Sequence, residues 1–229
     1  MFIGHFAVGF ASKKIAPKAS LGPLMAAPLL LDLLWPLFVL AGWERVRIAP
    51  GDTRFTPLEF VSYPWSHSLL AAAGWAAAFA LGYFAFSRYR EGAVVIAAGV
   101  LSHWFLDVVM HRPDMPLYPG GPRVGLGLWN SIAGTVLVES AMFAAAVWLY
   151  ASVTRPRDRA GTYGFWSLVL FLTAAYAGAA QGTPPPGVRA LALVGAATWL
   201  FPFWAGWFDA HREIVQLPGD GKRFSRSAP

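Results

Sequence analysis

The chain has 229 residues, of which 56% are hydrophobic and only 13% are Asp, Glu, Lys or Arg. Because a soluble domain carries charged residues at about twice that frequency, the composition indicates an integral membrane protein. There is no cysteine, and the formal net charge of +6 comes from residues spread thinly between apolar runs. This excludes disulfides and thiolate metal ligands and gives no nucleic-acid-binding pattern.

The N-terminal segment MFIGHFAVGFAS is apolar, but Lys13 and Lys14 end it before it could cross a bilayer. Because these basic residues follow the apolar core, we expect a short embedded or interfacial helix and not a cleavable signal peptide. Six longer apolar runs each reach the ~20 residues that a membrane span needs. They lie near 21–42, 66–87, 92–111, 127–151, 163–181 and 188–208.

The sequence thus predicts an all-α fold, a polytopic membrane bundle of about six transmembrane helices plus the short N-terminal helix. Residues 1–208 form one membrane domain, with the site-bearing part at 1–140 and scaffold helices at 141–208. A polar C-terminal tail follows at 209–229. Twelve of the 18 Lys and Arg residues fall on the side that holds both termini, which predicts that both termini are cytoplasmic.

Asp32 interrupts the first span, between Pro28 and Pro36. Pro36 has no N–H, so we expect a local kink there. A carboxylate beside a broken helix is typical of an ion or metal site in a membrane. The alternative interpretation is an Asp that caps the kink or pairs with a neighbouring histidine.

The third span carries three ionisable residues at helical spacing in LSHWFLDVVMHRP. His103, Asp107 and His111 stand at i, i+4 and i+8, within about 80° of one another around the helix. Such groups are costly at membrane depth unless they are paired, hydrated or bound to a cation. At 1.5 Å per residue, His103 lies about 12 Å and Asp32 about 15 Å below the outer span ends, so their depths match.

Three further polar residues could join them. His67 reaches this depth only if residues 55–65 dip inward, in which case Ser66 caps the second span. His5 stands alone in the N-terminal apolar run and needs a partner. Glu139 in the fourth span has a depth similar to that of Asp32 and could be a metal ligand, a general base or a hydrogen-bonded neighbour of a histidine.

The chain resembles the YdjM-type bacterial inner-membrane proteins, which are described as membrane-bound metal-dependent hydrolases. The resemblance covers about residues 1–120, and its ligand order is also similar to that of zinc-dependent phospholipase C. It implies an inner-membrane location and the metal ligands His5, Asp32, His67, His103 and Asp107. It rests on His5 with Gly9, the Asp32 segment, Ser66-His67-Ser68-Leu69 and Ser102-His103-x-x-x-Asp107 followed by Pro116-Leu117-Tyr118-Pro119.

We therefore predict a membrane-embedded metal-dependent hydrolase that acts on a phospholipid or another lipid-linked phosphoester. Zinc is the preferred cofactor, as one or two ions, because the ligands are mixed nitrogen and oxygen. Arg112 or Arg123 could pair with a phosphate group. The alternatives are a non-catalytic protein with a structural metal or His–Asp cluster, and a proton-coupled transporter. The candidate residues are Glu139 for catalysis and His5, Asp32, His67, His103, Asp107 and His111 for the metal.

Overall fold

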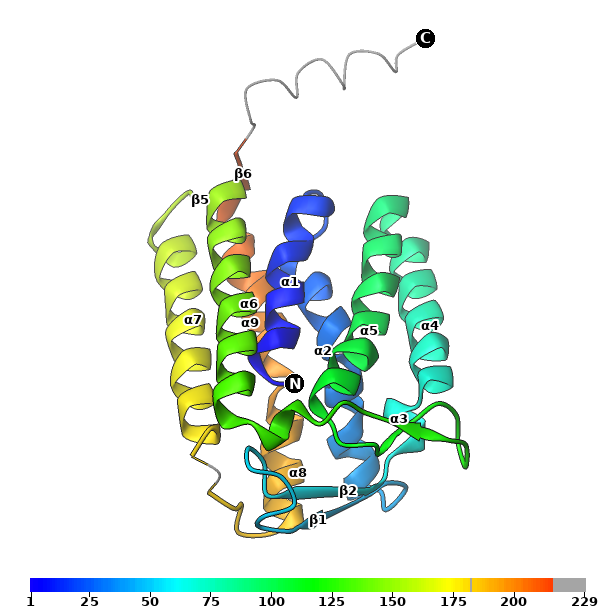
Figure 1. Ribbon diagram of the computed structural model, residues 1–229. Helices are drawn as coiled ribbons and strands as arrows, with labels where there is room; N and C mark the ends of the chain where they lie inside the picture. The colour runs from blue at the N-terminus through cyan, green and yellow to red at the C-terminus, as the bar shows by residue number, and fades with distance from the viewer. Residues whose placement is uncertain (182, 216–229) are drawn as a thin grey trace.

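The computed structural model describes residues 1–181 and 183–215 (Figure 1). Within that part of the chain, six helical segments are long and apolar enough to cross a membrane, by length and composition. The predicted all-α membrane bundle is therefore confirmed. The segments are α2 (Leu21–Leu40), α4 (Leu69–Ser87), α5 (Arg90–Met110), α6 (Ile132–Val153), α7 (Arg159–Ala179), and α8 (Val188–Ala197) with α9 (Leu200–Asp209).

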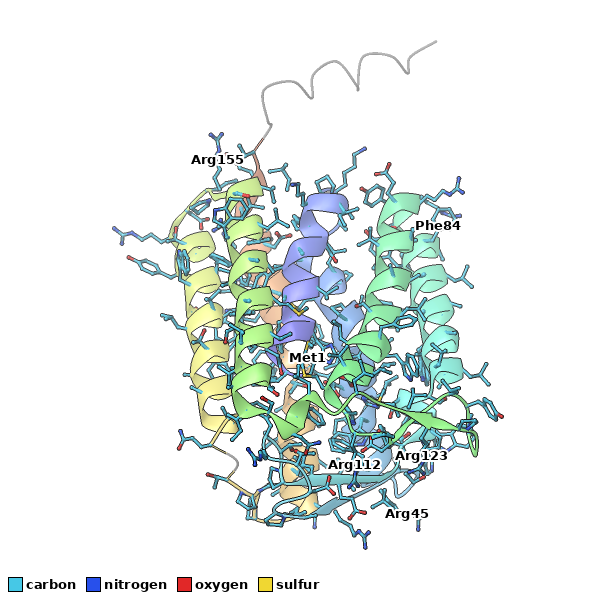
Figure 2. All side chains as sticks on the ribbon, in the orientation of Figure 1. Met1, Arg45, Phe84, Arg112, Arg123 and Arg155 are labelled. Atoms are coloured by element: carbon cyan, nitrogen blue, oxygen red, sulfur yellow. The ribbon has the colours of Figure 1, made fainter. Side chains whose placement is uncertain are left out.

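Short strands connect the helices at the two ends of the bundle. We call one end the hairpin end; Figure 2 places Arg45, Arg112 and Arg123 there. The opposite end, which carries Arg155, is the tail end. At the hairpin end β1 (Arg45–Ile48) pairs with β2 (Leu58–Ser62) and β3 (Met115–Pro116) with β4 (Arg123–Val124), while β5 (Thr154–Pro156) pairs with β6 (Arg212–Ile214) at the tail end.

Helix α1 (Ile3–Ile15) lies inside the bundle and packs against α2, α5 and α6 (Figure 1). Phe6 and Phe10 on this helix are at most 2% exposed, so the predicted short embedded helix is confirmed. Met1 is also buried, at neither polar end of the bundle. The cytoplasmic location of both termini stays a prediction.

The last predicted span is present but divided. Its two halves, α8 and α9, meet at Thr198 and Trp199. Pro202 has no N–H, so the carbonyl of Thr198 cannot receive its usual helical hydrogen bond. The amide of Phe201 donates to that carbonyl instead, at 3.0 Å, in a tighter turn. By contrast, α2 runs as one helix through both of its prolines.

A buried polar cluster joins the first helix to the last at the tail end. The carboxylate of Asp209 accepts hydrogen bonds from Lys13 Nζ at 2.7 Å, from the Leu21 amide at 2.9 Å and from the Tyr150 hydroxyl at 2.8 Å. We call these four residues the Asp209 cluster. Beyond it, β6 pairs with β5, so the first residues of the predicted 209–229 tail pack on the bundle. Residues 216–229 of that tail lie outside the described residues.

Helices α2 and α9 are in close contact where each has a glycine. A Cβ atom on Gly22 would lie 3.1 Å from the carbonyl oxygen of Pro202 and 3.4 Å from Cα of Gly206. Small residues at such crossings let two backbones pack directly against each other. Since the atoms that a side chain would meet belong to the backbone, they cannot move aside by changing a rotamer.

Replacing Gly22 by Leu is therefore expected to force α2 and α9 apart and to destabilise the protein by about 1–3 kcal/mol. Thermal unfolding in detergent measures this loss. The matched control is Gly74→Leu on α4, where a Cβ would have no atom within 4 Å. Equal melting temperatures for the two variants would contradict the close crossing.

Candidate metal centre

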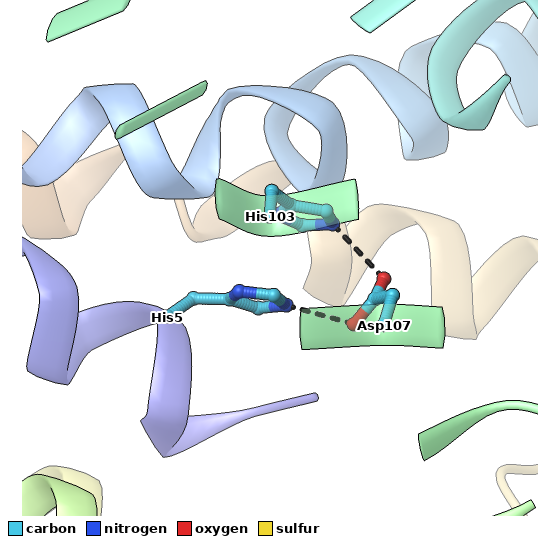
Figure 3. Close-up of side chains that lie close together, drawn as sticks. All are labelled: His5, His103 and Asp107. Atoms are coloured by element: carbon cyan, nitrogen blue, oxygen red, sulfur yellow. Dashed lines mark hydrogen bonds and ion pairs between the residues drawn. The ribbon is translucent and has the colours of Figure 1, made fainter. Parts of the chain in front are cut away.

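Three buried residues from α1 and α5 lie in close polar contact inside the bundle (Figure 3). Oδ1 of Asp107 lies 3.0 Å from Nε2 of His5, and Oδ2 lies 3.1 Å from Nε2 of His103. The two imidazole rings stack with centroids 3.8 Å apart and planes 4° from parallel. His103 and Asp107 meet because positions i and i+4 lie one above the other on a helix, as the spacing predicts.

A second group shares His103 with the first. Nε2 of His103 lies 3.2 Å from Nε2 of His67, which lies 3.4 Å from Oδ1 of Asp32. In each group, the three ligand atoms lie within 4.8 Å of one another. The structure thus brings together five of the predicted metal ligands from α1, α2, α3 and α5. We call them the His–Asp centre: His5, Asp32, His67, His103 and Asp107.

The short helix α3 (Pro64–His67) carries His67 into the bundle. Phe55 and Tyr63 are buried, but Trp65 at the end of the 55–65 segment is 53% exposed, so the predicted inward dip is present only in part. The expectation that Ser66 caps the second span is wrong. Ser68 does so, because its side chain accepts a hydrogen bond from the Ala71 amide and α4 begins one residue later.

The orientation of His103 follows from its second ring nitrogen. Nδ1 of His103 lies 2.7 Å from the carbonyl oxygen of Pro28. A carbonyl only accepts, so Nδ1 carries a hydrogen, and in the neutral ring Nε2 is the lone-pair nitrogen that faces the centre of the cluster. Metal-binding histidines characteristically donate their other N–H in this way.

Asp32 is the one residue of the His–Asp centre with a substantially exposed side chain. Its side chain is 42% exposed, whereas the side chains of the other four residues are at most 4% exposed. The protein therefore encloses the histidines and Asp107 but leaves one carboxylate accessible. Sites that bind and turn over a substrate keep such an open position, while structural metal sites are closed.

Glu139 and the amino end fix the first turn of α1 beside the centre. Oε2 of Glu139 accepts hydrogen bonds from the amides of Phe2 and Gly4, at 2.8 and 3.1 Å. The α-amino group of Met1 forms an ion pair with Asp107. The structure thus places Glu139 against the backbone that carries His5, outside both three-residue groups, and its catalytic role stays a prediction.

His111 lies between the centre and the hairpin end. Its Nε2 is 3.8 Å from Oδ2 of Asp107, and its Nδ1 is 3.0 Å from Oδ1 of Asp114. The Tyr63 hydroxyl donates to the same Asp114 oxygen at 2.8 Å. Burial lowers the pKa of the His111 imidazole and raises the pKa of the Tyr63 hydroxyl well above its ordinary value. Nδ1 of His111 therefore shares the Asp114 carboxylate with the Tyr63 hydroxyl, and the role of His111 as a metal ligand stays a prediction.

Two acidic residues beside the site were not expected from the sequence. Asp114 stands three residues after His111 in HRPD, a spacing that could have suggested the pair. Glu44, in the connection after α2, is 1% exposed and hydrogen-bonds to Ser66. In the sequence, Glu44 is only an acidic residue directly after an apolar span. An acidic residue in such a place is ordinarily solvated, so the sequence did not indicate that it is buried.

Comparison with known proteins identifies a family. The family model described as YdjM inner membrane protein matches residues 1–184. The match extends beyond the 1–120 segment on which the resemblance rests and includes every residue of the His–Asp centre. No curated protein and no solved structure matches the chain.

Proposed function

The chain belongs to the YdjM inner membrane protein family, and from that premise we propose that it is a membrane-embedded metal-dependent hydrolase. The observation that carries the proposal is the convergence of three imidazoles and two carboxylates on one buried point with an accessible edge at Asp32. Mixed nitrogen and oxygen ligands without cysteine suit zinc, as one or two ions. The similarity to zinc-dependent phospholipase C stays a prediction.

The residues of the His–Asp centre have different proposed roles, according to how buried each one is. The imidazoles of His5, His67 and His103, with the Asp107 carboxylate, would hold the metal from the enclosed side. A divalent ion bound there supplies Lewis-acid activation of water at neutral pH. The accessible carboxylate of Asp32 would accept the proton that the attacking water loses. Hydrolysis adds water across the phosphoester bond and releases an alcohol and a phosphate.

Of the two candidate arginines, Arg123 is the better placed to meet a phosphate group. Arg112 already pairs with Asp52 at 2.5 Å and lies near two further carboxylates. Arg123 instead lines a cavity of about 280 Å³ at the hairpin end, next to Tyr63 and Asp114. A phosphate group held by Arg123 would lie at the hairpin end of the bundle, and a phospholipid or lipid-linked phosphate is the substrate class that we propose.

The alternatives fit these contacts less well. A structural metal or a closed His–Asp cluster gives no reason for the exposure of Asp32. A proton-coupled transporter needs polar groups that continue to the tail end, but α5 reads GAVVIAAGV on that side of His103.

The proposal predicts that zinc-loaded protein hydrolyses a lipid phosphoester. Purified protein is mixed with vesicles of phosphatidylethanolamine and phosphatidylglycerol, and ³¹P NMR follows the lipid phosphorus. We expect a metal-dependent loss of at least one lipid signal, slowed roughly 100-fold or more by Asp32→Asn because a proton acceptor is removed.

The matched control is Asp158→Asn, at the tail end, where either residue can cap α7. It should leave the hydrolysis rate unchanged. Absence of hydrolysis by the metal-loaded wild type, for these lipids and for a polyprenyl phosphate, would remove the support for the proposal.

A further inference from the structure

A buried carboxylate outside the His–Asp centre binds the short helix that carries His67. Glu44 is 1% exposed, and its Oε1 accepts hydrogen bonds from the amides of Trp65 and Ser66, both at 2.8 Å. Its Oε2 accepts a third hydrogen bond from the Ser66 hydroxyl at 2.6 Å. That distance is typical of a strong hydrogen bond from a hydroxyl to a carboxylate.

This contact fixes the direction of the next hydrogen bond. The Ser66 hydroxyl has one hydrogen, and the Glu44 carboxylate can only accept it. The Ser66 oxygen must therefore act as acceptor toward Nδ1 of His67, which lies 2.7 Å away. It follows that Nδ1 of His67 carries a hydrogen.

The neutral His67 ring then has its lone pair on Nε2, directed at the His–Asp centre. Nε2 of His103 presents its own lone pair there, because Nδ1 of that ring donates to Pro28. The two nitrogens lie 3.2 Å apart, and each also faces a carboxylate oxygen, His103 Nε2 at 3.1 Å from Asp107 and His67 Nε2 at 3.4 Å from Asp32. Two lone pairs at this separation repel each other unless a cation or a proton lies between them, so the arrangement is prepared for a positive charge.

We propose that Glu44 and Ser66 are positioning residues that set the His67 tautomer so that Nε2 can bind a metal. The inference rests on the proposed function for the metal itself, while the tautomer is a property of the metal-free protein. Neither residue touches the His–Asp centre except through His67. Outer-shell partners of this kind typically change metal affinity by about 10–100-fold.

Glu44→Gln tests the direction of the hydrogen bonds. The amide oxygen can keep accepting from the Trp65 and Ser66 amides, while its NH₂ group replaces Oε2 and donates to the Ser66 oxygen. The Ser66 hydroxyl then donates to Nδ1 of His67, and the ring hydrogen moves to Nε2. We expect the tautomer to switch and zinc affinity to fall by about 10–100-fold.

The measurement is ¹⁵N NMR of histidine-labelled, chelator-treated protein in detergent, followed by zinc titration. The chain has only five histidines, so the His67 signal can be assigned by comparison with His67→Gln. Ser66→Ala should weaken zinc binding as Glu44→Gln does, and Ser66→Thr, which keeps the hydroxyl, should restore it. Glu91→Gln, an exposed carboxylate at the tail end, is the control for loss of charge.

The outcomes distinguish the two proposals. An unchanged His67 tautomer in folded Glu44→Gln overturns the positioning role, even if zinc affinity falls. If the wild type carries the Nδ1–H tautomer but binds no zinc, the metal-dependent function fails and the positioning role of Glu44 stands. Weaker zinc binding together with a switched tautomer supports both.

Discussion

Replacing His103 and Asp107 by Ala together is expected to abolish metal binding. Wild-type protein purified without chelator should contain about one or two zinc ions per chain, and the double variant about a tenth of that or less. The effect is large because His103 belongs to both three-residue groups and Asp107 contacts His5 and His103 with its two oxygens. Plasma mass spectrometry of the detergent-purified protein measures the content.

The chain offers a matched control in a second His–Asp pair. Nδ1 of His211 lies 2.7 Å from Oδ2 of Asp158 at the tail end, and both side chains are more than one-third exposed. His211→Ala/Asp158→Ala removes the same residue types and should leave the zinc content unchanged. Equal zinc in the two double variants, or no zinc in the wild type after reloading, would contradict the metal centre.

The second large effect concerns stability. Asp209→Asn is expected to destabilise the protein by about 3–5 kcal/mol, because it leaves the buried Lys13 ammonium without its carboxylate. Lys13 and Asp209 have side chains only 8% and 6% exposed, and their charged atoms lie 2.7 Å apart. Denaturant unfolding in detergent measures the change. The asparagine oxygen can still accept a hydrogen bond, so the loss reports mainly the unpaired charge.

Two further variants test whether the unpaired Lys13 charge causes the loss of stability. Lys13→Met added to Asp209→Asn removes the unpaired charge and should recover much of the lost stability. Glu213→Gln breaks the Arg155–Glu213 ion pair, whose side chains are 70% and 44% exposed, and should cost less than about 1 kcal/mol. A similar small loss for Asp209→Asn would show that the Asp209 cluster is dispensable.

The sequence predicted the spans well because bilayer thickness and helix geometry leave few alternatives. It also predicted that His103 and Asp107 share a face, since that depends on one helix alone. His67 was harder, because its position depends on how the connection before α4 folds. The expected inward dip is present only in part, and the cap was assigned to Ser66 although Ser68, two residues later, caps α4.

Contacts between distant segments could not be predicted in the same way. Glu44 precedes Ser66 by 22 residues and meets it only because a hairpin returns the chain to the end of α2. Glu139 meets the amide of Phe2 across 137 residues, a contact that no local pattern encodes. The composition of the tail likewise gave no sign that Arg212–Ile214 would pair with β5.

The order of the elements along the chain has a consequence for biosynthesis. All five residues of the His–Asp centre precede α6, which supplies the Glu139 contact to the first turn of α1. Because polypeptides are made from the amino end, these parts can meet while α7–α9 are still being synthesised. The ion pair between Lys13 and Asp209 can form only after α9 has been inserted. A ribosome stalled within α7 would therefore leave the five ligands together while the far end of α1, at Lys13, still lacks its ion pair with Asp209.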